Sequence, residues 1–328
     1  MENLTMNRWV RVLSVFAVLI TLCLSAAAAG SGYKVVKKIP VAGEGSWDYL
    51  TVDSDAHRLY VSHGTQVEVI DLDAGKVAGQ IPDTAGVHGI ALAPGFGRGY
   101  TSNGKSNNST MFDTKTLKIL GQVPTGSKPD AIIYDPASKR VFTFNGDGKS
   151  ATAINAADGK VVGTVDLGGG PEFAAADGAG KIFVNLEEEN MTVAFDSQQL
   201  KVLNKWPLDP CKTPTAMAMD RKNRRLFIGC RSRVAAIVNA DTGKVIQTLP
   251  IGDHVDAAAF DSEEGLVFFS NGDGTINVLH QDSPDQYTAI DTIQTAPRAK
   301  TMTFDPVTKR LYLSTVEAGQ FEILVVGR

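Results

Sequence analysis

Cysteine and histidine are scarce in this chain of 328 residues, which limits the chemistry that it can offer. The sequence has three cysteines and five histidines, and no two histidines have the spacing that is typical of a zinc site (His57, His63, His88, His254 and His280). The Gly-x-Ser-x-Gly motif that carries the nucleophile of α/β-hydrolases is also absent. The sequence therefore argues against a zinc module and against a hydrolase of that class.

Long apolar runs are confined to the N-terminus, where one run extends from Val12 to Leu24. Arg8 and Arg11 precede it and the small residues 25–29 follow it, a pattern typical of a secretory signal peptide. The run is too short for a comfortable transmembrane helix. We therefore expect residues 1–29 to be removed near Ala29. Residues 30–328 are then expected to form one periplasmic or secreted domain with no transmembrane segment.

Positive charge is not in excess, since the chain has 32 Lys and Arg residues against 36 Asp and Glu residues. Removal of residues 1–29 takes away two basic residues and one acidic residue, which leaves 30 against 35 and a formal charge of −5. An acidic protein has no overall attraction for phosphate backbones or anionic lipids. This balance disfavours nucleic acid as a partner.

A repeat of about 40 residues occupies the rest of the chain. Seven short apolar segments carry an aromatic residue at the same place, with gaps of 40, 42, 41, 44, 41 and 44 residues (Tyr60, Tyr100, Phe142, Phe183, Phe227, Phe268 and Tyr312). A period of this length with strand-like segments and glycine-rich turns is typical of a β-propeller with one repeat per blade. The sequence predicts an all-β, seven-bladed propeller with four-stranded antiparallel blades.

The two ends of the chain predict how the ring closes. The last repeat ends one strand after Tyr312, so it lacks an outer strand. Residues 34–41 match the outer strand at 244–251, including its proline, but have no repeat of their own. We expect residues 34–41 to pair with the last blade, because closure removes the exposed edges of an open array.

The aromatic strands resemble the YVTN-type propeller repeat, as in Tyr60-Val61-Ser62-His63, Tyr100-Thr101-Ser102-Asn103 and Phe268-Phe269-Ser270-Asn271. Residues 33–328 are similar to YncE-like proteins, and this resemblance implies a propeller fold and an exported location. The family has no shared catalytic motif. Single-stranded DNA binding is reported for one member, but no residue motif in this chain carries that activity over. More distantly, such propellers are similar to lactonases and to the scaffolds of quinoprotein dehydrogenases.

The repeat also predicts a set of polar residues at the mouth of the axial channel. Each lies five residues before the position that ends an inner strand, and we call them the channel-mouth set: Asp48, His88, Asp130, Glu172, Thr215, Asp256 and Lys300. Clustered carboxylates repel one another unless a positive charge lies between them. The set either binds a polar ligand or a divalent cation such as calcium, with Asp130, Glu172 and Asp256 as candidate metal ligands, or lines a water-filled channel.

Cys211 and Cys230 remain after signal removal. The first precedes the inner strand of the fifth repeat and the second ends the neighbouring strand, so antiparallel pairing brings them together. The sequence predicts a disulfide between them, as expected for an exported protein.

These observations favour a monomeric, exported and non-catalytic propeller that binds a small polar ligand or a protein at the channel mouth. A metal-dependent lactone hydrolase is the alternative, with channel carboxylates holding the cation. Single-stranded DNA binding is a third and weaker option.

Overall fold

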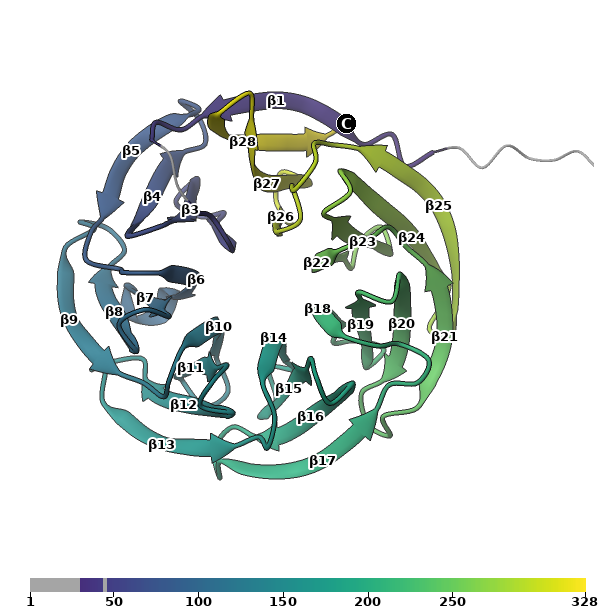
Figure 1. The fold of residues 1–328 in the computed structure, drawn as a ribbon, viewed down its shortest axis with the longest axis horizontal. Coiled ribbons are helices and arrows are strands. Elements are labelled where there is room, and N and C mark those ends of the chain that lie inside the picture. The colour runs from purple at the N-terminus through teal and green to yellow at the C-terminus, as the bar shows by residue number, and fades with distance from the viewer. Residues whose placement is uncertain (1–29, 44–45) are drawn as a thin grey trace, which may run out of the picture.

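The computed structural model describes residues 30–43 and 46–328. The predicted signal peptide, residues 1–29, lies outside this range. Within the described residues, the chain forms seven four-stranded antiparallel sheets arranged as blades around a central axis (Figure 1). The predicted seven-bladed propeller is confirmed. The one described helix is the 3-10 turn η1 (Pro94–Phe96), and no described helix is long and apolar enough to cross a membrane.

Six blades run from the axis outward in chain order, and the last blade takes its outer strand from the N-terminal end of the described chain. The innermost strands are β2 (Leu50–Asp53), β6 (Val87–Ala93), β10 (Pro129–Asp135), β14 (Pro171–Ala176), β18 (Pro214–Asp220), β22 (Val255–Asp261) and β26 (Met302–Asp305). The second strands are β3 (Arg58–His63), β7 (Arg98–Asn103), β11 (Arg140–Asn145), β15 (Lys181–Leu186), β19 (Arg225–Cys230), β23 (Leu266–Asn271) and β27 (Arg310–Glu317). The third strands are β4 (Gln66–Asp71), β8 (Asn108–Asp113), β12 (Ser150–Asn155), β16 (Met191–Asp196), β20 (Val234–Asn239), β24 (Thr275–Ser283) and β28 (Gln320–Gly327). The outer strands are β5 (Lys76–Ile81), β9 (Ile119–Pro124), β13 (Val161–Asp166), β17 (Lys201–Pro207), β21 (Val245–Pro250), β25 (Gln286–Gln294) and β1 (Lys34–Pro40).

Strand β1 closes the ring from the other end of the chain. It pairs antiparallel with β28, with Lys34 opposite Gly327 and Pro40 opposite Glu322. The purple β1 therefore lies outside the yellow β28, β27 and β26 (Figure 1). The predicted pairing of the N-terminal strand with the last blade is confirmed.

The seven repeated aromatics lie in the second strands and are almost completely buried (Tyr60, Tyr100, Phe142, Phe183, Phe227, Phe268 and Tyr312). Several contact the next blade. Phe142 packs edge-to-face on Phe195, with ring centroids 5.6 Å apart, and the Tyr60 hydroxyl donates a hydrogen bond to the Thr114 carbonyl at 3.3 Å. Large aromatic rings bury much apolar area, so they stabilise the packing between neighbouring blades.

The aspartates that end the inner strands bind the turns that follow them. Asp135, for example, accepts hydrogen bonds from the backbone N–H groups of Ala137 and Ser138 at 3.2 and 3.0 Å. Such Asx-type contacts fix the turn, as the repeat predicts. These carboxylates therefore stabilise the turns that follow the inner strands.

Cys211 and Cys230 form a disulfide, with their Cα atoms 5.6 Å apart. It joins the loop before β18 to the end of β19, and both cysteines are buried. The disulfide predicted from the repeat is confirmed.

Candidate functional site

The channel-mouth set lies where the loops lead into the inner strands. Several of its backbone carbonyls accept hydrogen bonds from hydroxyl groups of the preceding blade: Thr301 donates to Asp48 at 2.7 Å, Ser102 donates to Asp130, and Ser270 donates to Lys300. These hydrogen bonds fix the backbone of one blade against that of the next. The side chains of the set are held at a common level by the fold itself.

Asp48, His88 and Asp130 come together from three consecutive blades. The His88 Nδ1 atom lies 2.7 Å from Asp48 Oδ2 and 3.6 Å from Asp130 Oδ1. One ligand atom from each residue lies within 4.8 Å of the other two, a spacing compatible with a metal ion. Burial opposes protonation of His88, but its hydrogen bond to Asp48 and the charge of Asp130 outweigh this effect and raise its pKa. The His88 ring therefore lies between the two carboxylates.

Burial raises the pKa of Asp130 to about 6, with Asp48 and Asp256 adding repulsion while His88 opposes the rise. The effect is larger at Glu172. Burial, the charge of Asp130 and a hydrogen bond with the Glu187 carboxyl raise the pKa of Glu172 to about 10. At neutral pH the Glu172 carboxyl is therefore protonated and the negative charge of the mouth is reduced.

Asp256 has basic neighbours. Lys300 Nζ lies 2.5 Å from its carboxylate and Arg231 lies 3.7 Å from it, while Arg231 also donates to Glu187 at 2.7 Å. Burial raises the pKa of Asp256 even though Lys300 opposes the rise. Thr215 is the one member of the set without a titratable side chain. It is buried, and its hydroxyl donates to the Val255 carbonyl at 2.6 Å.

The three residues predicted as metal ligands thus have separate partners: Asp130 faces His88, Glu172 meets Glu187, and Asp256 pairs with Lys300. The group with metal-like spacing instead contains Asp48, His88 and Asp130. The assignment of a cation to Asp130, Glu172 and Asp256 stays a prediction.

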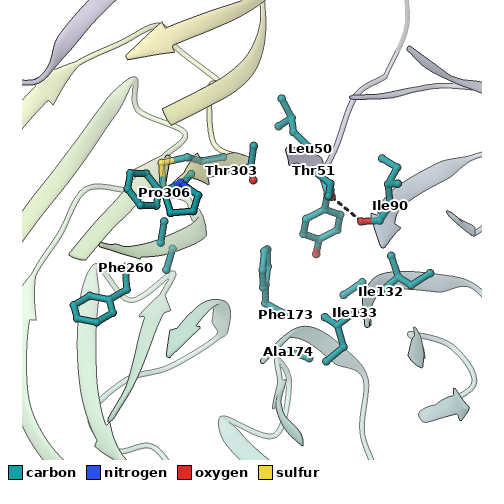
Figure 2. A pocket seen from close by; sticks show the side chains of 17 residues that line it. Leu50, Thr51, Ile90, Ile132, Ile133, Phe173, Ala174, Phe260, Thr303 and Pro306 are labelled. Atoms are coloured by element: carbon teal, nitrogen blue, oxygen red, sulfur yellow. Dashed lines mark hydrogen bonds between the residues drawn. The ribbon is translucent and has the colours of Figure 1, made fainter. Parts of the chain in front are cut away.

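An aromatic pair lies just below the mouth. Tyr49 and Phe173 project from blades on opposite sides of the axis and meet edge-to-face, with ring centroids 5.0 Å apart. Both line an axial cavity of about 390 Å³ whose other walls are mostly apolar residues of the inner strands. Figure 2 shows Phe173 pointing into this cavity across from Ile132 and Thr51, with Thr51 donating to the Ile90 carbonyl. Burial and the nearby carboxylates keep the pKa of Tyr49 well above its usual value, so its hydroxyl stays neutral.

Two further cavities open on the mouth side of this pair. One, of about 480 Å³, is lined by Asp48 and His88 together with Lys105, Lys128 and Asp147. The other, of about 570 Å³, is lined by Ser46, Trp47, His254, Gly272, Arg298 and Lys300. Ser46 and Trp47 belong to both. Cavities of this size suit small-molecule ligands.

Sequence reasoning missed Arg298, which lines the second cavity, and Lys128, which lines the first. They occupy one repeated position, two residues before the channel-mouth set, which we call the loop set: Ser46, Gly86, Lys128, Gly170, Thr213, His254 and Arg298. Counting seven residues back from each strand end, instead of five, finds them. Three of the seven positions hold basic or imidazole side chains.

Three basic residues of the fifth blade, Arg224, Arg225 and Arg231, are held in ion pairs, whereas Arg221, Lys222 and Arg233 are exposed. Arg224 contacts Asp177 and Asp241 at 2.9 and 2.8 Å, and Arg225 contacts Asp285 at 2.6 Å. With Arg231 placed against Glu187, these side chains do not form an unpaired basic stripe.

Comparison with known proteins supports the fold but assigns no family. No protein-family model and no curated protein matches the chain. Among solved structures, "Structure of U3-55K" has a TM-score of 0.76 at 10% identity, covering 90% of this chain and 98% of that one. The chain has a seven-bladed β-propeller fold.

Two other structures agree with this fold. "Crystal Structure of Mitotic Checkpoint Complex" has a TM-score of 0.76 at 12% identity, covering 97% of this chain and 99% of that one. "Kuenenia stuttgartiensis Hydrazine Synthase" has a TM-score of 0.75 at 13% identity, covering 86% and 96%. At such identities the likeness shows architecture alone, because propellers host many unrelated functions.

Proposed function

We propose that this protein is an exported, non-catalytic propeller of the YVTN-repeat, YncE-like type, which binds a small polar ligand through a cationic group at the channel mouth. The observation that carries the proposal is the raised pKa of Asp130 and Glu172 in a site next to open cavities. Buried carboxylates that also lie near other carboxylates bind protons unless a positive charge stabilises their ionised form. A cationic ligand takes the place of those protons.

The signal-peptide pattern of residues 1–29 and the disulfide support export, since disulfides persist in oxidising compartments. The cavity beside Asp48 and His88 supports a ligand of small-molecule size. Lys300 and Arg231 contact Asp256 and His88 contacts Asp48, which leaves Asp130 and Glu172 to receive the added charge.

Proton release on binding tests the proposal. Because a cation lowers the pKa of Glu172 and Asp130, binding of an alkylammonium probe should expel protons, and its affinity should rise with pH. Calorimetry with hexylammonium in buffers of different ionisation enthalpy measures the protons released.

Asp130→Asn should weaken binding about tenfold, a loss of roughly 1.4 kcal/mol. The matched control is Asp55→Asn, which neutralises an exposed carboxylate in the turn after β2. Binding without proton release, or equal losses in both variants, would contradict the proposal.

A metal-dependent lactone hydrolase is the second candidate, and the spacing of Asp48, His88 and Asp130 favours it. Two carboxylates and an imidazole suit zinc or manganese better than calcium, which prefers oxygen ligands. A cation held there would polarise a lactone carbonyl and activate water. This candidate requires that a divalent ion raise the Tm of the wild type but not of Asp130→Asn, and that the metal-loaded protein open a lactone ring. A protein without either response is not this hydrolase.

A further inference from the structure

The apolar cavity on the axis of the propeller differs in character from the charged channel mouth. It is the cavity of about 390 Å³ below the pair of Tyr49 and Phe173, and its walls come from the inner strands β2, β6, β10, β14, β22 and β26. Among the described residues that line it, none has a charged side chain, and the hydroxyl groups are those of Tyr49, Thr51 and Thr303. Thr51 already donates to the Ile90 carbonyl at 2.6 Å. The walls therefore offer little to stabilise an ion.

The repeat explains why space remains on the axis. The residues that directly follow the channel-mouth set are aromatic in two blades and small in the others: Tyr49, Gly89, Ala131, Phe173, Ala216, Ala257 and Thr301. The two rings meet across the axis, with centroids 5.0 Å apart, and separate the charged mouth from the cavity. Beyond them the wall includes Ala174, Ala258 and Ala259, which leave space where larger side chains would fill the channel. Phe173 points into that space (Figure 2).

The aromatic part of the wall is held in place from behind. Phe260 packs on Phe227, with ring centroids 4.9 Å apart. Phe304 packs on Phe268 at 5.9 Å, and both Phe227 and Phe268 are buried. A cavity whose walls are already packed needs little rearrangement to accept a ligand.

The cavity continues toward the face opposite the channel mouth. It shares five lining residues with a wider space of about 800 Å³: Thr51, Ile90, Ile132, Ile133 and Pro306. That wider space reaches the turn after β2, where Asp55 and Ala56 are exposed. A small molecule that enters from this face reaches the cavity without passing between Tyr49 and Phe173.

Volume and lining together define the occupant. An apolar cavity of roughly 150 Å³ binds benzene. The axial cavity, at about 390 Å³, has room for more than one ring. Burial of a charged group without a partner is costly, whereas aromatic rings pack favourably against other rings. We propose that the axial cavity binds a neutral aromatic small molecule with more than one ring, at a site separate from the cation site proposed at the mouth.

Binding of N-phenyl-1-naphthylamine, a neutral probe that fluoresces in apolar surroundings, tests this proposal. Titration of the purified protein should show saturable binding with one probe per chain. The matched probe is 1-anilinonaphthalene-8-sulfonate, which has the same ring system and adds a negative charge. It should bind at least about tenfold more weakly, because no basic side chain among the described lining residues stabilises a buried sulfonate. Affinity for the neutral probe should stay constant between about pH 5 and about pH 8, unlike binding coupled to the carboxylates of the mouth.

Thr303→Phe places a large ring in the cavity from a side chain that is only partly buried. It should weaken binding of the neutral probe at least about tenfold, because the added ring takes up space that the probe needs. Thr164→Phe is the matched control, since it makes the same substitution at an exposed position of the outer strand β13 and should leave the affinity unchanged. Circular dichroism shows whether both variants fold. If Thr303→Phe does not fold, Thr303→Leu adds less volume at the same position and should still weaken binding relative to the control.

The proposal is wrong if the neutral probe does not saturate, if the sulfonate binds as tightly as the neutral probe, or if the variants of Thr303 bind it as Thr164→Phe does. Affinity for the neutral probe that changes with pH would place the probe at the mouth instead of in the axial cavity. Each of these results leaves the proposed function standing, because that function uses Asp130 and Glu172 and is measured with hexylammonium.

Discussion

Individual side chains at the channel mouth work against the stability of the fold, and Glu172 does so most clearly. A carboxyl with a pKa of about 10 in the folded protein keeps its proton, whereas the unfolded chain releases it near the usual value for glutamate. Between those values the unfolded state binds fewer protons, so the free energy of unfolding falls as pH rises. Glu172→Gln keeps the shape and removes the titration. We expect a gain on the order of 1 kcal/mol at neutral pH.

Denaturant unfolding of Glu172→Gln and the wild type across the range from acid to mildly basic pH measures this effect. The gain should be absent at acid pH and grow as pH increases. Glu188→Gln is the matched control, because Glu188 is exposed in the turn after β15, one residue beyond Glu187, the partner of Glu172. A control that gains as much as Glu172→Gln, or a gain that is independent of pH, would show that burial of Glu172 is not the cause.

The sequence locates the residues of the site but not their partners. The repeat places Asp48, His88 and Asp130 at one level, because homologous positions recur around the axis. It does not show that His88 bridges two carboxylates or that Thr215 turns to the Val255 carbonyl. Those contacts depend on rotamers chosen against the neighbouring blade, and a count along the chain holds no information about them.

Among the structural elements, strand β1 has the largest effect on closure of the ring. Ile39 in β1 is 2% exposed and packs with Phe321 and Ile323 in the core of the last blade. Truncation to alanine leaves a cavity and weakens the joint between the two ends of the chain. We expect Ile39→Ala to cost about 2–5 kcal/mol, as buried isoleucines do.

Val36→Ala serves as the control on the same strand, since Val36 is 43% exposed and should change stability by no more than about 0.5 kcal/mol. Chemical denaturation of both variants measures the difference. Equal effects would mean that β1 does not bury its side chains against β28 as described.

The sequence predicts the number of blades, the position of the second strands and the strand that closes the ring. The seven aromatics mark the second strands because each inter-blade joint needs one large buried ring, so the same physical demand recurs at every repeat. The unmatched N-terminal strand follows from the same count, since a closed ring leaves no repeat without its outer strand. Strand pairing within the blades is local and periodic, and this is why the sequence pattern predicts it.

For the molecule as a whole, the distribution of charge decides which partners are attracted. The chain is acidic overall, and several of its arginines are held in ion pairs, as Arg224 and Arg225 are in the fifth blade. Nucleic-acid binding requires several unpaired basic groups along a continuous path, because affinity comes from neutralising successive phosphates. The charge distribution instead favours a ligand with few charges.

We therefore expect no binding of single-stranded DNA at physiological salt. A fluorescent thymidine oligonucleotide titrated with the protein should show no change in anisotropy, and lowering the salt should produce at most weak binding. The control is Asp241→Ala, which removes one of the two acidic partners of Arg224. If removal of this partner produces salt-dependent binding, ion pairing is what suppresses the interaction. Tight binding by the wild type, weakening steeply with added salt, would contradict the expectation and place a phosphate path on this propeller.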